Sequence, residues 1–262
     1  MFFLYATDER VILKKNDKII FDSCPCIQMH DNRPFRILNN KDFFVTQKDS
    51  KYYSPFHGCV MSDCNIGSWF LNKIVRNKFF FNRDKCRIAI SPVTGGSELL
   101  YIQNWYTRWF DNKRPILIYE PVAFLKGVNR KTGIVISLRY SMVELTYVEN
   151  GTITRYWWKY HHQFRYKNNQ KLDSGKQLEN QIDIAQIYNQ IQLRLEREKA
   201  SIVNVLISQI KQIICNSEYR GISIFFAAYK NYTLFTSEQC ETFNINCLNY
   251  ENFCETILRG LQ

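Results

Sequence analysis

Short runs of consecutive apolar residues occur near the start and near the middle of the chain. After each set of runs comes a segment in which the apolar residues are three or four positions apart, the spacing of one helix face. The first runs, bounded by turn residues, predict strands over 1–6, 10–15 and 18–29, followed by an irregular polar segment over 30–57. Apolar residues three or four positions apart predict a helix over 68–80, because that spacing places them on one helix face. The rest of this half predicts a strand, a helix, a strand and a short helix over 85–93, 97–110, 115–120 and 121–128.

The second half of the chain begins again with a predicted hairpin. Its strands are Gly133–Val148, which folds back on itself, and Thr152–Trp158. A long helix, two strands and a last helix follow, over about 178–214, 221–228, 243–248 and 250–261. Strands that alternate with helices indicate an α/β fold. We divide the chain into a first lobe over 1–128 and a second lobe over 129–262, with the last helix a candidate to pack back on the first lobe.

The composition is that of a folded protein with a basic balance of charge. Of 262 residues 45% are hydrophobic, and 35 Lys and Arg against 24 Asp and Glu give a net charge of +11. This charge favours acidic partners, although it also fits a basic surface that only aids solubility. The nine cysteines include no C-x-x-C pair, which predicts reduced thiols in the cytoplasm and no metal site. No apolar run approaches the roughly 20 residues of a membrane span.

Five segments, in order along the chain, are similar to segments of the MreB-type bacterial actin-like proteins, within the actin–Hsp70–sugar kinase superfamily. They are SPFHGCVMSD at 54–63, IAISPV at 88–93 followed by Glu98, YEPVAFLKG at 119–127, VELTYVENGTI at 143–153 and YRGISI at 219–224. The resemblance implies an actin-like (RNase H-like) fold of two lobes, each with a small outer subdomain. The chain is short over 30–57 and 154–177, where the family has those subdomains, so we expect both to be reduced.

The three nucleotide-binding loops of that family are altered in this sequence. Positions that match their glycines and carboxylates, or lie beside them, carry other residues, namely Leu4, Ala6, Ser137, Arg139, Tyr140 and Tyr229. Glycine matters in such loops because backbone N–H groups must converge on the phosphate, and Mg²⁺ prefers carboxylate oxygens. We therefore expect no bound nucleotide, no cofactor and no ATP hydrolysis.

Two acidic residues, Asp63 and Glu98, match the family's cleft aspartate and its water-activating glutamate. Each also has a structural interpretation. Asp63 can cap the helix that begins near residue 65, and Glu98 can sit in the first turn of its own helix, where the helix dipole favours a carboxylate. We interpret both as vestigial cleft positions and expect no catalytic residue.

The segment RYWWKYHHQFRYKNNQK at 155–171 interleaves aromatic rings with positive charge. This composition suits an acidic protein face, an anionic membrane surface or nucleic acid. The candidate partner-binding residues are Arg155, Trp157, Lys159, Arg165 and Lys167. The alternative is a hairpin extension in which Tyr156, Trp158 and Tyr160 pack inward while Arg155, Trp157 and Lys159 face water.

Taken together, these features favour a non-hydrolysing actin-like scaffold in the bacterial cytoplasm. It would bind a protein with an acidic face, in a cell-shape or assembly-platform role, and would form no homofilament. Three alternatives stay open: a divergent actin-like ATPase that forms filaments, a scaffold of a pilus or secretion platform, and a nucleic-acid-binding protein that uses 155–171.

Overall fold

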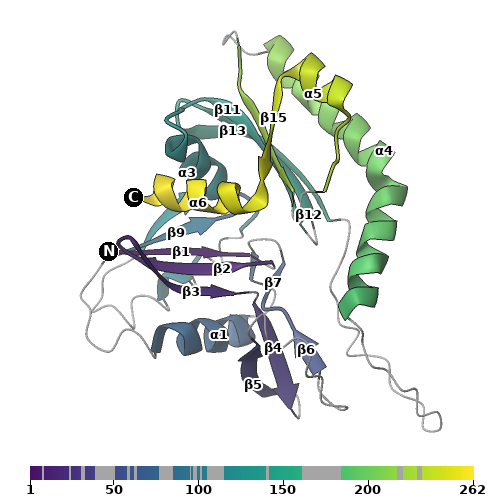
Figure 1. Ribbon diagram of the computed structural model, residues 1–262. Coiled ribbons are helices and arrows are strands. Elements are labelled where there is room, and N and C mark those ends of the chain that lie inside the picture. The colour runs from purple at the N-terminus through teal and green to yellow at the C-terminus, as the bar shows by residue number, and fades with distance from the viewer. Residues whose placement is uncertain are drawn as a thin grey trace, which may run out of the picture.

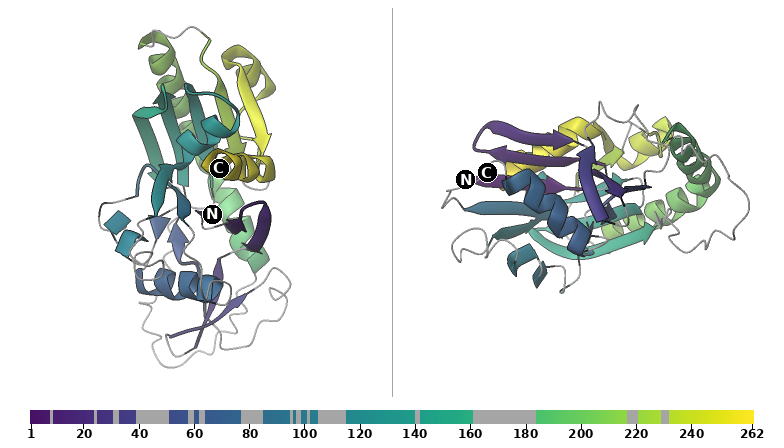
Figure 2. Two further views of the ribbon diagram at one scale, coloured as in Figure 1. Left: turned by 90° about the vertical axis from the view of Figure 1, so that its left-hand side faces the viewer. Right: turned by 90° about the horizontal axis from the view of Figure 1, so that it is seen from below.

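The computed structural model of this chain shows two lobes, one above the other in Figure 1. The structure describes residues 1–7, 9–23, 25–30, 33–38, 51–57, 60–61, 64–76, 85–94, 96, 99–100, 102–104, 115–139, 142–160, 184–216, 221–228 and 232–262. The two chain ends lie near each other beside the first lobe (Figure 2), where the Gln262 amide donates a hydrogen bond of 3.3 Å to Asp17.

The first lobe is built on a five-stranded sheet in the order β10-β9-β1-β2-β3. Its strands are β1 (Phe2–Ala6), β2 (Val11–Lys15), β3 (Lys18–Ser23), β9 (Cys86–Ile90) and β10 (Ile116–Tyr119). Because neighbouring side chains of a strand point to opposite faces, Phe2 and Leu4 pack with helix α1 (Cys64–Arg76), while Phe3 and Tyr5 pack toward the second lobe. Both faces of β1 are therefore buried.

Two small sheets extend the first lobe. β4 (Cys26–His30) pairs with β5 (Arg33–Leu38) and β6 (Lys51–Tyr53), and β7 (Phe56–His57) pairs with β8 (Val60–Met61).

Two sequence-based predictions are wrong in this region. A single strand over 18–29 is wrong because β3 and β4 belong to different sheets and Pro25, which has no backbone N–H, lies between them. An irregular segment over 30–57 is also wrong, since β5, β6 and β7 lie in it. Arg33 and Arg36 of β5 are exposed, whereas Ile37 packs against the apolar cluster of the first lobe, so this strand lacks the continuous apolar run that marks the buried strands in the sequence.

The second lobe repeats the sheet of the first. Its order is β13-β12-β11-β14-β15, with a three-stranded antiparallel part continued by parallel strands, as in β3-β2-β1-β9-β10. The strands are β11 (Gly133–Leu138), β12 (Met142–Glu149), β13 (Thr152–Tyr160), β14 (Ile224–Ala228) and β15 (Ile245–Asn249).

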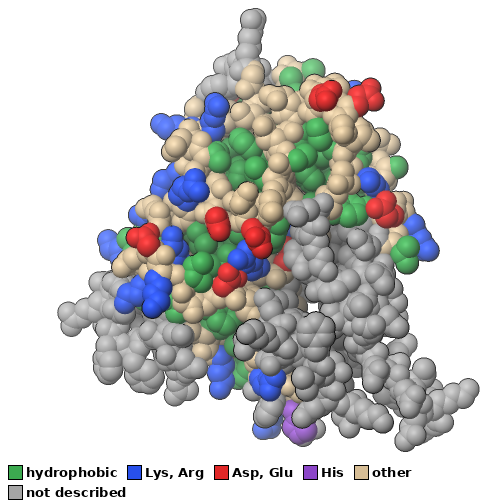
Figure 3. Space-filling model, in the orientation of Figure 1, with side chains coloured by type: hydrophobic (Ala, Val, Ile, Leu, Met, Phe, Trp, Pro, Cys, Tyr) green, Lys and Arg blue, Asp and Glu red, His purple; other side chains and the backbone are tan. Residues whose placement is uncertain are grey.

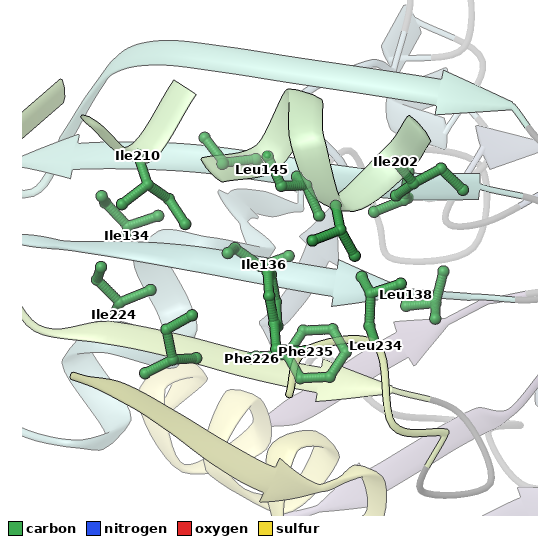
Figure 4. Packing of buried hydrophobic residues seen from close by; sticks show 14 of the residues in the cluster. Ile134, Ile136, Leu138, Leu145, Ile202, Ile210, Ile224, Phe226, Leu234 and Phe235 are labelled. Atoms are coloured by element: carbon green, nitrogen blue, oxygen red, sulfur yellow. The ribbon is translucent and has the colours of Figure 1, made fainter. Parts of the chain in front are cut away.

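Helix α4 (Ile184–Asn216) covers one face of this second sheet. Ile202 and Ile210 of α4 lie over Ile134 and Ile136 of β11 (Figure 4), and Leu206, between them at helical spacing, belongs to the same buried cluster. Further members of the cluster come from β12, β14, β15 and the segment before helix α5 (Ser237–Phe243), and α5 itself packs against it. A buried apolar cluster of this size holds α4 to its sheet.

Two helices connect the lobes. α3 (Glu120–Gly127) links β10 to the second lobe, and α6 (Tyr250–Leu261) follows β15 and contacts β1 and β9 of the first. Their backbones touch, since a Cβ atom on Gly260 would lie 1.7 Å from the carbonyl oxygen of Ala123. One buried cluster with members from both lobes surrounds this crossing. The lobes are therefore joined by a continuous apolar core.

Candidate functional site

The short turn between β11 and β12 carries a buried arginine into the space between the lobes. The backbone N–H of Arg139 donates to the carbonyl of Met142 at 2.8 Å, which closes the hairpin with only residues 140 and 141 between them. Arg139 is 1% exposed, although arginine is rarely buried without a partner. Its surroundings must therefore supply opposite charge and hydrogen-bond acceptors.

Two carboxylates and two phenol groups surround the Arg139 guanidinium. Nη2 donates to both carboxylate oxygens of Glu120, the first residue of α3, and Nε donates to Oε2 of Glu144 on β12 at 3.3 Å. Nη1 donates to the hydroxyl groups of Tyr5 at 3.1 Å and Tyr250 at 3.5 Å. All three guanidinium nitrogens of Arg139 therefore bind side chains of this cluster, which come from both lobes and both connecting helices.

Hydroxyl groups satisfy the second carboxylate. Ser91, at the end of β9, donates to Oε1 of Glu144, and Ser137 on β11 donates to Oε2 at 3.2 Å. The side chains of Ser137 and Glu144 share a face because the two residues are paired across β11 and β12. Ser91 and Ser137 are both buried, so Glu144 is tied to each lobe by one hydroxyl.

The turn between β1 and β2 reaches the same cluster through Thr7. Its hydroxyl accepts hydrogen bonds from the backbone N–H groups of Glu9 and Arg10, and it lies 3.4 Å from the Tyr250 hydroxyl. Burial raises the pKa of Tyr250 well above its ordinary value, and the negative charge of Glu9 raises it further. Glu9, Glu120 and Glu144 are all buried, so three acidic side chains are withdrawn from water at this boundary.

We call this group the inter-lobe cluster; its members are Tyr5, Thr7, Ser91, Glu120, Ser137, Arg139, Glu144 and Tyr250. The sequence pointed to Ser137 and Arg139 as altered loop positions, and the structure brings them together. It places Leu4 and Ala6 within β1, in the apolar core beside α1. The predicted positions Asp63, Glu98, Tyr140 and Tyr229 lie outside the described residues.

The sequence interpretation missed the carboxylates that pair with Arg139. A signal for Glu144 was present, because it stands as the one charged residue between Met142 and Val148, in a run that is otherwise almost entirely apolar. A charge in a buried strand requires a partner. Glu120 opens α3 within the segment YEPVAFLKG, where the resemblance gave it no role. Only the folded chain brings Glu120 and Glu144 together.

The candidate partner-binding residues on β13 face the helix α4 side of the sheet. Arg155 donates to Gln212 at 3.0 Å, Lys159 forms an ion pair with Glu198 at 3.3 Å, and Trp157 packs against the apolar cluster under α4. Arg165 and Lys167 lie outside the described residues. Three of the five candidates are therefore engaged with the protein's own helix.

The predicted alternation of β13 is wrong. Trp157 packs on the core, whereas Tyr156 and Trp158 are 52% and 42% exposed. The cause is a register shift between Tyr147 and Val148 of β12, where Thr154 is an extra residue in β13. Ile153 consequently packs toward the lobe boundary and Trp157 toward α4, although residues four apart in a regular strand share a face.

Comparison with known proteins identifies the architecture. No protein-family model matches the sequence, and no curated protein matches it significantly. MreB 5 of Spiroplasma citri bound to AMPPNP superposes with a TM-score of 0.69 at 10% identity, covering 99% of this chain and 94% of that one. The same protein bound to ADP gives a TM-score of 0.66 at 10% identity, with the same coverage.

The fold is actin-like. An identity of 10% shows the fold alone, so the nucleotides of the MreB 5 structures carry no assignment to this chain. Among the described residues, no group of three or more His, Cys, Asp and Glu side chains is arranged to hold a metal ion. Within the same part of the chain, no helix is long and apolar enough to cross a membrane.

Proposed function

We propose that this actin-like protein is a non-hydrolysing scaffold of the bacterial cytoplasm that acts by binding another protein, in a cell-shape or assembly-platform role. The observation that supports the proposal most is the inter-lobe cluster. Arg139 stands at the turn that resembles the family's second phosphate loop, and its guanidinium is already paired with Glu120 and Glu144. An arginine engaged in this way has no donor left to bind a phosphate.

Charge and backbone geometry support the same proposal. The carboxylates of Glu120 and Glu144 already occupy the Arg139 guanidinium, so the phosphates of a nucleotide would have to compete with them for it. The backbone N–H of Arg139, which a phosphate loop would direct toward the anion, is bonded to Met142 instead. Binding a nucleotide here would require breaking buried, charged hydrogen bonds, which is costly.

The packing of α3 against α6 between the lobes favours a protein whose lobes keep one relative position over one whose lobes close on a nucleotide. Gly127 and Gly260 let α3 and α6 touch, since Cβ atoms there would lie 2.1 Å from the carbonyl oxygen of Thr256 and 1.7 Å from that of Ala123. Close backbone contact and a continuous core resist small displacements. The superpositions cover 94% of the MreB 5 chain and therefore do not show that the outer subdomains of this protein are reduced. Their reduction stays a prediction.

For the partner surface we propose the outward face of β13, with Tyr156 and Trp158 as anchors. Both are large, partly exposed aromatic residues on an edge strand, and aromatic residues of this kind dominate many protein interfaces. The strand leads into the basic stretch of 161–171, which favours a partner with an acidic face. On the face seen in Figure 3, Lys and Arg side chains are spread over the surface with Asp and Glu among them. Overall charge on that face therefore does not define the docking site.

Sedimentation and negative-stain electron microscopy, with and without ATP and Mg²⁺, test the scaffold proposal. MreB 5 of Spiroplasma citri, which has been crystallised with AMPPNP and with ADP, is a matched control under the same conditions. We expect this protein to stay in the supernatant as a monomer or small oligomer in every condition. Filaments that form only with ATP and Mg²⁺ would contradict the proposal.

A further inference from the structure

Two cysteines of the second lobe lie side by side at its outer sheet edge. The sulfur atoms of Cys240 on α5 and Cys247 on β15 are 3.6 Å apart. Cys247 is exposed and Cys240 is partly exposed, so small molecules reach both from solvent. Closing such a pair to a disulfide bond length of about 2.05 Å requires a side-chain rotation of modest size.

Regular structure on both sides holds this pair in place. The hydroxyl of Thr236 and the side chain of Gln239 form a capping box that fixes the start of α5. Asn244 then ends the helix in the left-handed conformation, with φ of 50°, and returns the chain into β15. Cys247 pairs with Phe226 in the parallel ladder with β14. The approach of the two sulfur atoms is thus a consequence of the fold.

The other cysteines whose side chains are described differ from this pair. Cys86 and Cys254 are buried, Cys26 is half-buried, and Cys215 is exposed on α4. Burial raises the pKa of Cys26 and of Cys254 to about 12 and that of Cys247 to about 11, so all three thiols stay mostly protonated at neutral pH. The pair therefore differs from Cys86 and Cys254 in its access to solvent and in the distance of 3.6 Å between its sulfur atoms.

We propose that Cys240 and Cys247 form a reversible disulfide when the protein meets a low-molecular-weight disulfide such as oxidised glutathione. In the first exchange, one cysteine thiolate attacks the small disulfide, forms a mixed disulfide and releases one small thiolate. In the second, the other cysteine attacks the mixed disulfide, closes the protein disulfide and releases the second small thiolate. The protein loses two protons and two electrons, which together are two hydrogen atoms, and the small disulfide takes them up to become two thiols.

The bond would join α5 to the edge strand that leads into the inter-lobe helix. β15 ends at Asn249, whose side chain caps α6, and Tyr250 of α6 belongs to the inter-lobe cluster. Closing the short loop from Cys240 to Cys247 reduces the freedom of the unfolded chain, so oxidation is expected to raise the Tm by a few degrees. In a reducing cytoplasm such a bond is transient and responds to oxidants.

Intact-mass spectrometry of the full chain, incubated with oxidised glutathione and then acid-quenched, tests the proposal. We expect the loss of two hydrogen atoms without a glutathione adduct at this pair, and full reversal by a dithiol reductant. Cleavage after glutamate places Cys240, Cys247 and Cys254 on separate peptides, because Glu241 and Glu251 lie between them. The cross-linked peptide should join Cys240 to Cys247.

Three variants complete the experiment. Cys240→Ser and Cys247→Ser should each lose the cross-link and accumulate a glutathione adduct on the remaining cysteine of the pair. Cys215→Ser, which changes an exposed cysteine elsewhere, should keep the cross-link. A wild-type protein that gains stable adducts on both Cys240 and Cys247, links either to another cysteine, or leaves both thiols reduced would overturn the proposal.

Discussion

The guanidinium of Arg139 donates two hydrogen bonds to the carboxylate of Glu120, and so joins the first hairpin of the second lobe to the helix that leaves the first. Both side chains are almost completely buried. Burying an ion pair costs desolvation free energy. Removing one partner costs more, because the other charge then stays buried without compensation.

Replacing Arg139 with methionine should therefore destabilise the protein strongly. The change leaves the carboxylates of Glu120 and Glu144 buried without their guanidinium, which is expected to lower the free energy of unfolding by about 3–5 kcal/mol. Urea denaturation followed by circular dichroism measures this loss. Arg10→Met is a matched comparison, because the bidentate ion pair of Arg10 with Asp22 is partly solvent-exposed and its loss should cost less, about 1–2 kcal/mol. Equal losses in the two variants would contradict the prediction.

The contact between the connecting helices predicts a second effect. Alanine normally favours a helix over glycine, but a Cβ atom on Gly260 would lie 1.7 Å from the carbonyl oxygen of Ala123. Gly260→Ala should therefore force α3 and α6 apart and cost about 3 kcal/mol. Gly96→Ala is the control, since its Cβ would meet nothing within 4 Å, and it should leave the Tm nearly unchanged. A neutral Gly260→Ala variant would show that the helices separate easily.

Alkaline pH should destabilise the protein through Cys254, whose pKa burial raises from 9.0 to about 12. Above pH 9 the unfolded chain loses this proton while the folded protein keeps it, so stability falls as pH rises toward 12. One such group contributes a slope of about 1.4 kcal/mol per pH unit in that window. The slope for Cys254→Ala, from urea titrations between pH 9 and 11, should be shallower by this amount. Identical slopes would argue against the raised pKa.

Adjacent tryptophans on β13 should respond differently to truncation. Trp157 packs against the apolar cluster under α4, so Trp157→Ala should cost about 3 kcal/mol of stability. Trp158 is 42% exposed, and Trp158→Ala should cost about 1 kcal/mol. Once a partner has been isolated by crosslinking, Trp158→Ala should weaken its binding by about 2 kcal/mol or more. Unchanged affinity for Trp158→Ala in calorimetry would remove this residue from the interface.

The apolar patterns of single segments predicted several strands of the sheets. Side-chain contacts between segments far apart in the sequence could not be predicted. Continuous apolar runs identified β11, β12 and β14, because strands buried on both faces tolerate few polar residues. In the sequence, Ser137 and Arg139 were noticeable only because they replace the carboxylate and glycine expected in a phosphate-binding loop. Their new role depends on Glu120 and Glu144, and pairing across the fold leaves no periodic signal in the sequence. The face of Trp157 was equally hidden, since one extra residue, Thr154, reverses the alternation of β13.

Calorimetric titration with ATP in the presence of Mg²⁺ tests the central claim most directly. Because Arg139 is paired with Glu120 and Glu144, we expect no binding tighter than the millimolar range, equivalent to about 4 kcal/mol, while MreB 5 of Spiroplasma citri under the same conditions serves as the nucleotide-binding control. Micromolar binding of ATP that needs Mg²⁺ would contradict the claim that the inter-lobe cluster excludes nucleotide, on which the scaffold proposal rests.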